Sequence, residues 1–141
     1  MDLHRRLAET FSAGEMDAFI AYCDPSIEFH TEFAAVAGCY QGHDGMRKFF
    51  RDYDDVWGEG IRVEPEAYFD LGEHTLLFIV VRGHGRHSGL EVVMASAHLA
   101  RWRDGLLIYF KAYAHREDAL RDLGVSQNAL ESAQADLGLK E

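Results

Sequence analysis

A histidine within a predicted strand is the strongest candidate for chemistry in this chain. The segment Val-Met-Ala-Ser-Ala-His-Leu-Ala-Arg-Trp ends at Trp102. If Trp102 faces inward, the alternation of a strand turns His98 and Met94 to the same side. Small Ser96 and Ala100, on that side too, would leave room around the imidazole, as a ligand pocket requires. A histidine can give or take a proton near neutral pH, so His98 is a candidate acid/base residue. The alternative is a core histidine that is hydrogen-bonded to a neighbour, or a ligand anchor without chemistry.

Tyrosines are the second kind of candidate, because a buried phenol needs a hydrogen-bond partner and can donate to a ligand carbonyl. Tyr113 is preferred, since its predicted strand neighbours the His98 strand in a hairpin, although its face stays open. Tyr40 is also expected to contact a ligand, and Tyr22, Tyr68 and Tyr109 are further phenols of this kind. For each tyrosine taken singly, an aromatic core residue with its hydroxyl in water is the simpler interpretation.

Residues 26–32 alternate as a half-buried strand does. Phe29 and Thr31 share a face with Ile27 and are expected to line the pocket. The opposite face carries Glu28, His30 and Glu32. Their spacing could suit a metal ion, but three polar residues opposite an apolar face are typical of a solvated surface, so no metal site is predicted. If the two faces were reversed, His30 would join His98 as an acid/base pair.

Composition narrows the class of protein and its partners. The chain has 141 residues, the size of one domain, with 14 Lys and Arg against 24 Asp and Glu and a formal charge of −10. An acidic chain lacks the basic footprint that phosphate binding needs, which disfavours nucleic acids and anionic membranes as partners. No window of about 18 residues is apolar enough to span a bilayer, and the N-terminus lacks the apolar stretch of a signal peptide, so a cytoplasmic protein is expected.

The order of elements predicts an α+β fold, with helices gathered at one end of an antiparallel sheet. The predicted helices cover the residues before Gly14 and residues 15–23, 43–57 and 116–123; the predicted strands cover 26–32, 62–70, 75–82, 90–103 and 106–114, with a loop at 33–42. The domain is expected to span residues 1–124, and residues 125–141 form a peripheral helix or tail.

The run from Leu76 to Val81 has no polar alternation. A strand that is apolar on both faces is usually covered on both faces, and large exposed apolar patches are rare on monomers. We therefore predict a homodimer that forms through the outer face of the sheet.

Four motifs carry a family resemblance: Phe11-Ser-Ala-Gly-Glu-Met-Asp-Ala-Phe19, Asp24-Pro-Ser-Ile-Glu-Phe29, Tyr40-Gln-Gly-His-Asp-Gly-Met46 and Arg103-Asp-Gly105 with the strand after it. They resemble the nuclear-transport-factor-2-like (NTF2-like) superfamily, in its SnoaL-like (polyketide-cyclase-like) branch. The resemblance implies a cone-shaped α+β fold, in which a curved, mixed, mainly antiparallel sheet wraps around three helices and leaves a pocket. It also implies frequent dimers.

The resemblance transfers an activity only where residues match. Ketosteroid isomerases of this superfamily use a tyrosine on the first helix, an aspartate base on the first strand and a protonated aspartate on a late strand. These positions fall on Leu7, Phe29 and His98, so isomerase activity is not carried over. The water-activating Asp-Arg-Asp set of the epoxide hydrolases is not found on the predicted inward faces. The cyclases use an inward Asp or His as acid/base, and His98 fits that role.

Two hypotheses of function follow. In the first, the chain binds a small apolar or carbonyl-bearing molecule and, if catalytic, moves protons on it without a cofactor, with His98 as the acid/base residue. The expected ligand contacts are Phe29, Thr31, Tyr40, Met94, Ser96, Trp102 and Tyr113. In the second, the chain is a non-catalytic ligand carrier or sensor, or a dimeric assembly module.

Overall fold

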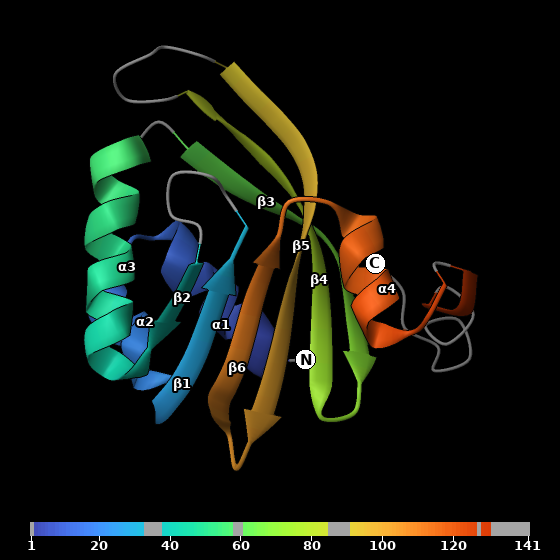
Figure 1. Ribbon diagram of the computed structural model, residues 1–141, viewed down its shortest axis with the longest axis horizontal. Coiled ribbons are helices and arrows are strands. Elements are labelled where there is room, and N and C mark those ends of the chain that lie inside the picture. The colour runs from blue at the N-terminus through green and yellow to red at the C-terminus, as the bar shows by residue number, and fades with distance from the viewer. Residues whose placement is uncertain (1, 33–37, 58–60, 85–90, 127, 131–141) are drawn as a thin grey trace.

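The computed structural model describes residues 2–32, 38–57, 61–84, 91–126 and 128–130 (Figure 1). The helices are α1 (Asp2–Ser12), α2 (Met16–Ala21), α3 (Gly42–Trp57) and α4 (Arg116–Leu123), and the strands are β1 (Cys23–Thr31), β2 (Gly38–Gln41), β3 (Ile61–Leu71), β4 (His74–His84), β5 (Glu91–Arg103) and β6 (Leu106–Tyr113). The predicted α+β class is confirmed. Strand β2 was not predicted, because a four-residue edge strand that contains a glycine carries too short a pattern.

The six strands form one curved sheet in the order β2-β1-β6-β5-β4-β3. All neighbours pair antiparallel except β1 and β6, which run parallel, so the sheet is mixed. Register shifts interrupt three of the pairings, and such bulges bend a strand and increase its twist. The predicted Asp-Gly hairpin joins β5 to β6, where Asp104 and Gly105 both have positive φ angles, of 53° and 80°, as a tight two-residue turn requires.

Helices lie on both faces of the sheet (Figure 1). We call the face that packs against α1, α2 and α3 the inner face and the face under α4 the outer face. The inner core includes Leu7, Phe19, Ile27, Phe29, Met46, Phe49, Leu107 and Phe110. The outer core includes Phe69, Leu76, Phe78, Leu99, Tyr113, Ala119 and Leu130. The described part of the chain contains no helix that is both long and apolar enough to cross a membrane.

The apolar strand β4 is buried within a single chain. Leu77 and Ile79 belong to an inner-face cluster, whereas Leu76 and Phe78 lie in the outer core with residues of α4. Arg116, at the start of α4, links this helix to β4. Its Nη2 donates to the carbonyl of Ile79 at 2.9 Å, and its guanidinium lies 4.6 Å from the centre of the Phe78 ring. The premise of the dimer prediction was therefore wrong, because α4 covers the face that a second chain was expected to cover. The dimer itself stays a prediction.

The predicted tail falls mostly outside the described residues. Of 125–141, the structure describes 125, 126 and 128–130, and Leu130 is buried in the outer core. The boundary at residue 124 stays a prediction. Gly124 caps α4 in the left-handed conformation, with φ 71°, which fits the predicted end of that helix.

Candidate functional site

His98 lies on the inner face, as predicted, at the centre of the sheet. Its neighbours across the strands are Leu77 on β4 and Ala112 on β6. The imidazole packs against two aromatic rings, with centroid distances of 4.9 Å to Phe110 and 6.5 Å to Phe11. Within the described residues, neither ring nitrogen has a hydrogen-bond partner. Burial lowers the pKa of His98 to about 4, so the ring is neutral at pH 7 and offers one N–H donor and one lone pair.

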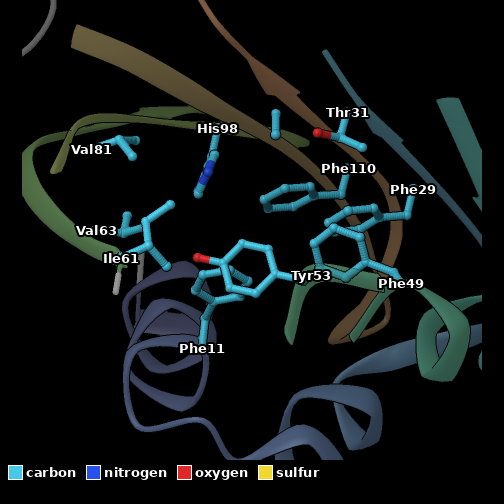
Figure 2. Close-up of a pocket in the computed structure, with 11 residues that line it drawn as sticks. Phe11, Phe29, Thr31, Phe49, Tyr53, Ile61, Val63, Val81, His98 and Phe110 are labelled. Carbon is cyan, nitrogen blue, oxygen red and sulfur yellow. The ribbon is translucent and has the colours of Figure 1, made fainter. Parts of the chain in front are cut away.

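The imidazole projects into a narrow cavity (Figure 2). The cavity offers about 40 Å³ to the centres of water molecules, and its lining consists of Phe11, Phe29, Thr31, Phe49, Tyr53, Ile61, Val63, Val81, His98, Phe110 and Ala112. Five of these side chains are aromatic rings of Phe or Tyr, which favours a flat apolar ligand. The ring of Phe29 stacks on that of Phe110 with a centroid distance of 4.7 Å and an interplanar angle of 2°, so this wall is flat.

The narrow cavity has a mouth on the surface. Phe11, Tyr53, Ile61 and Val63 line it and also line a wider hollow between α1, α3 and β3, which offers about 770 Å³ to water centres. The shared residues show that the two spaces adjoin. A ligand that reached from one space into the other would pass between these shared side chains.

Tyr53 supplies a second polar group that was not predicted. Its hydroxyl and the imidazole of His98 both point into the cavity (Figure 2). Within the described residues the hydroxyl has no hydrogen-bond partner, and burial raises the pKa of Tyr53 above its usual value, so it remains a donor at neutral pH. Tyr53 falls within the predicted helix 43–57, one turn after Phe49. A phenol that continues a stripe of phenylalanines is the signal that could have marked it.

Two predicted ligand contacts, Phe29 and Thr31, line the cavity beside His98. Tyr113 does not, and this prediction was wrong. Its cross-strand partner is Ala97, which faces the outer core, and its hydroxyl donates to Asp122 Oδ2 at 2.7 Å. Tyr40 also lies elsewhere, because it stands on the edge strand β2 and donates to Asp52 at 3.0 Å.

The remaining predicted contacts have the predicted face but do not line the cavity. The Ser96 hydroxyl is buried and donates to the carbonyl of Ala114 at 3.0 Å. The indole N–H of Trp102 donates to Thr75 Oγ1 at 2.9 Å. Met94 packs beside the inner-face cluster of β4. Each was expected at the ligand because alternation identifies the face of a residue but not its distance from the cavity.

His30 lies on the outer face, so the alternative with two histidines facing each other from β1 and β5 is wrong. Its Nε2 is 3.3 Å from Glu28 Oε2, and its ring lies 5.3 Å from that of Tyr109. In the part of the chain that the structure describes, no group of three or more His, Cys, Asp or Glu side chains could hold a metal ion.

Comparison with known families agrees with this architecture. The family model described as a SnoaL-like domain matches residues 4–110. The chain belongs to the SnoaL-like family. This family and its NTF2-like relatives include isomerases and cyclases. No curated protein sequence matches the chain.

Solved structures share the fold at low sequence identity. An NTF2-like protein of unknown function from Burkholderia pseudomallei has a TM-score of 0.75 and 19% identity, covering 86% of this chain and 94% of that one. TerC, co-crystallised with polyporic acid, has a TM-score of 0.71 and 17% identity, covering 86% and 95%. A protein with a ketosteroid isomerase-like fold from Catenulispora acidiphila, in complex with trimethylamine, has a TM-score of 0.70 and 14% identity, covering 88% and 93%. These identities establish the fold alone.

Proposed function

We propose that this SnoaL-like domain binds a small, flat, apolar molecule whose carbonyl oxygen lies between His98 and Tyr53. The observation that supports this proposal is that an imidazole and a phenol, with Thr31 nearby, line a cavity with aromatic walls. A buried polar group without a partner costs free energy, and a ligand oxygen that accepts hydrogen bonds recovers that cost. Similar folds accommodate organic molecules, since TerC was co-crystallised with polyporic acid.

Protonation favours a neutral oxygen as the recognised group. His98 is neutral at pH 7, because burial lowers its pKa to about 4, and Tyr53 stays protonated, because burial raises its pKa. The imidazole and the phenol can each donate one hydrogen bond to a carbonyl. Neither adds a charge to the cavity, so a charged ligand group would lose its hydration without gaining an ion pair.

A matched pair of probes tests this proposal. 1-Tetralone and tetralin have the same fused rings, but only 1-tetralone carries a carbonyl. We expect protein-observed NMR titration to show tighter binding of 1-tetralone, by roughly tenfold, the ratio that corresponds to about one net hydrogen bond. His98→Phe and Tyr53→Phe should each reduce this preference. Equal affinity of the wild type for the two probes would contradict the proposal.

His30→Phe is the matched control. It removes an imidazole from the outer face, where His30 contacts Glu28 and no cavity-lining residue, so it should leave the preference for 1-tetralone unchanged. Native mass spectrometry of the freshly purified protein would complement the titration, because a co-purified hydrophobic compound would identify the natural ligand class and the same spectrum would report the oligomer.

A second candidate function is proton transfer on the bound carbonyl compound, without a cofactor. The neutral imidazole of His98 favours it, because its nitrogens are not committed to other described residues and can give or take a proton. 1-Tetralone again serves as the probe, since the hydrogens next to its carbonyl exchange with deuterium when it enolises. Faster exchange with the wild type than with His98→Phe would support catalysis, and equal rates would leave the domain as a carrier or sensor.

A further inference from the structure

A buried histidine lies beside His98, on helix α1. His4 is 1% exposed, and its Nδ1 is 2.7 Å from Thr75 Oγ1. The same hydroxyl oxygen is 2.9 Å from the indole nitrogen of Trp102. The other ring nitrogen of His4, Nε2, is buried and has no hydrogen-bond partner among the described residues.

The donors in this chain of contacts determine where the proton of His4 lies. The indole N–H of Trp102 can only donate, so Thr75 Oγ1 accepts from it. The hydroxyl proton of Thr75 then has one described acceptor, the Nδ1 lone pair of His4. Burial, followed by the influence of His98, lowers the pKa of His4 to about 3, so the ring carries a single proton at neutral pH. These contacts favour that proton on Nε2, where it is a buried donor without a described acceptor.

A small cavity lies between the two histidines. His4 and His98 both line it, and it offers about 20 Å³ to the centre of a water molecule. Its other lining residues are mostly apolar: Leu7, Ala8, Phe11, Ser12, Phe19, Val63, Pro65, Leu77 and Phe110. One water needs roughly 10–15 Å³ and two to four polar partners, so the space and the two imidazoles suit one water molecule.

We propose that one water molecule binds between His4 and His98, and that His4 thereby fixes His98 as a hydrogen-bond donor toward the ligand. The water accepts the Nε2–H of His4 and donates to the ring nitrogen of His98 that carries the lone pair. The remaining nitrogen of His98 carries the proton and is available to the ligand. His4 is a positioning residue, because it acts on the ligand only through this water and His98.

This inference rests on the proposed function and narrows it. With its N–H directed at the ligand, His98 recognises an oxygen that accepts hydrogen bonds, such as that of a ketone or quinone. An ammonium group has only donors to offer to the same N–H and is rejected. The site therefore selects hydrogen-bond acceptors.

The test uses ligand-free protein labelled with ¹⁵N, so it is independent of ligand binding. Long-range ¹H–¹⁵N spectra report which nitrogen of a histidine carries the proton. We expect a single tautomer of His98 in the wild type and a magnetisation-transfer signal from a long-lived water to the ring. Tautomer averaging, together with loss of that signal, is expected in His4→Leu, which removes the donor and keeps apolar bulk.

His4→Gln is the matched variant, because its side-chain amide reaches about as far as Nε2 and still donates, while it loses the contact with Thr75. It should restore the single tautomer and the water signal, whereas a purely structural role of His4 predicts the same change in both variants. Averaged tautomers or no water signal in the wild type would overturn the inference. If His4→Leu does not fold, a crystal structure of the wild type decides: an ordered oxygen within hydrogen-bond distance of both rings supports the inference, and its absence there overturns it. Failure of 1-tetralone to bind would refute the proposed function without altering these spectra.

Discussion

Replacement of His98 by leucine should stabilise the ligand-free protein. A fully buried polar group without a partner costs the folded state roughly 1–3 kcal/mol, and His98 is partly exposed to the cavity, which places its cost toward the low end. Because a bound water satisfies one of the two nitrogens in our proposal, we expect the low end, about 1 kcal/mol. For a domain of this length that corresponds to a rise in Tm of roughly 3 °C. A site that binds a ligand commonly lowers the stability of the empty protein in this way.

The same substitution should also change how stability depends on pH. The pKa of His98 falls from 6.5 in the unfolded chain to about 4 in the folded protein, so protonation favours unfolding. The free energy of unfolding is therefore highest above pH 6.5, where the ring is neutral in both states, and it falls progressively between pH 6.5 and 4. Between pH 7 and 5 the wild type loses ~2 kcal/mol through this residue alone, given about 1.4 kcal/mol per pH unit below 6.5. His98→Leu has no such titrating group. The excess of its free energy of unfolding over that of the wild type should therefore grow from about 1 kcal/mol at pH 7 to about 3 kcal/mol at pH 5.

Urea unfolding at pH 7 and pH 5 measures both effects, followed by tryptophan fluorescence. The carboxylates titrate in both proteins, so their contribution cancels in the difference between wild type and variant. His98 also lowers the pKa of His4, so this difference reports the titration of His98 together with its effect on His4. His30→Leu is the control: His30 is partly exposed on the outer face, and its replacement should change stability by no more than about 0.5 kcal/mol. A wild type and His98→Leu with parallel pH dependence would refute the claim that His98 is buried in a neutral form.

Three further substitutions test the inner core, the outer face and one turn, each by urea unfolding. Phe29→Ala should cost about 3–5 kcal/mol, because the ring is 2% exposed and stacks on a second ring; a cost below about 1 kcal/mol would contradict the packing. Tyr113→Phe should lower the free energy of unfolding by about 1 kcal/mol, because it loses the hydrogen bond to Asp122. It should leave the affinity for 1-tetralone unchanged, and a lower affinity would indicate that Tyr113 contacts the ligand. Gly42→Ala should cost about 1–2 kcal/mol, because φ is +71° and the added Cβ would lie 3.2 Å from a backbone oxygen; an unchanged midpoint would show that this turn relaxes freely.

Strand periodicity explains which site residues could be predicted. Two-residue alternation along β1 and β5 placed Phe29 and His98 on the same face as their inward neighbours, and the structure has both on the inner face. Tyr113 was misplaced because the register changes between the turn and His98. The pairing next to the Asp-Gly turn extrapolates to Tyr113 opposite inward Ser96. A register shift at Arg101 and Trp102 instead pairs Tyr113 with outward Ala97. Residues that face each other in paired strands share a face, and nothing in the sequence marked this shift.

Helix periodicity is less informative about a cavity. A helical stripe marks the residues that face the core, but it does not separate those that pack from those that border a gap. Tyr53 continues the stripe of Phe49 on α3, and His4 precedes two arginines on α1, so neither had a distinctive signal. Both acquire a role only from the distance between their helix and the sheet, which depends on long-range packing.

The three positions that correspond to the isomerase residues bear on whether the site retains a ligand or turns it over. Leu7 and Phe29 are 1% and 2% exposed and belong to the inner core, and Phe29 is part of the aromatic wall of the cavity. An abstracted proton needs a basic group at the ligand, and none of the described residues that line the narrow cavity is a carboxylate. In the proposed water-bridged tautomer, His98 and Tyr53 both donate a hydrogen bond to the ligand. The lone pair of His98 then accepts a hydrogen bond from the water. Two donors facing a carbonyl hold it and polarise it, but they leave no base to remove a proton from the adjacent carbon. Two donors at the ligand therefore fit the proposed binding of a carbonyl compound, whereas a tautomer of His98 with its lone pair toward the cavity would fit proton transfer.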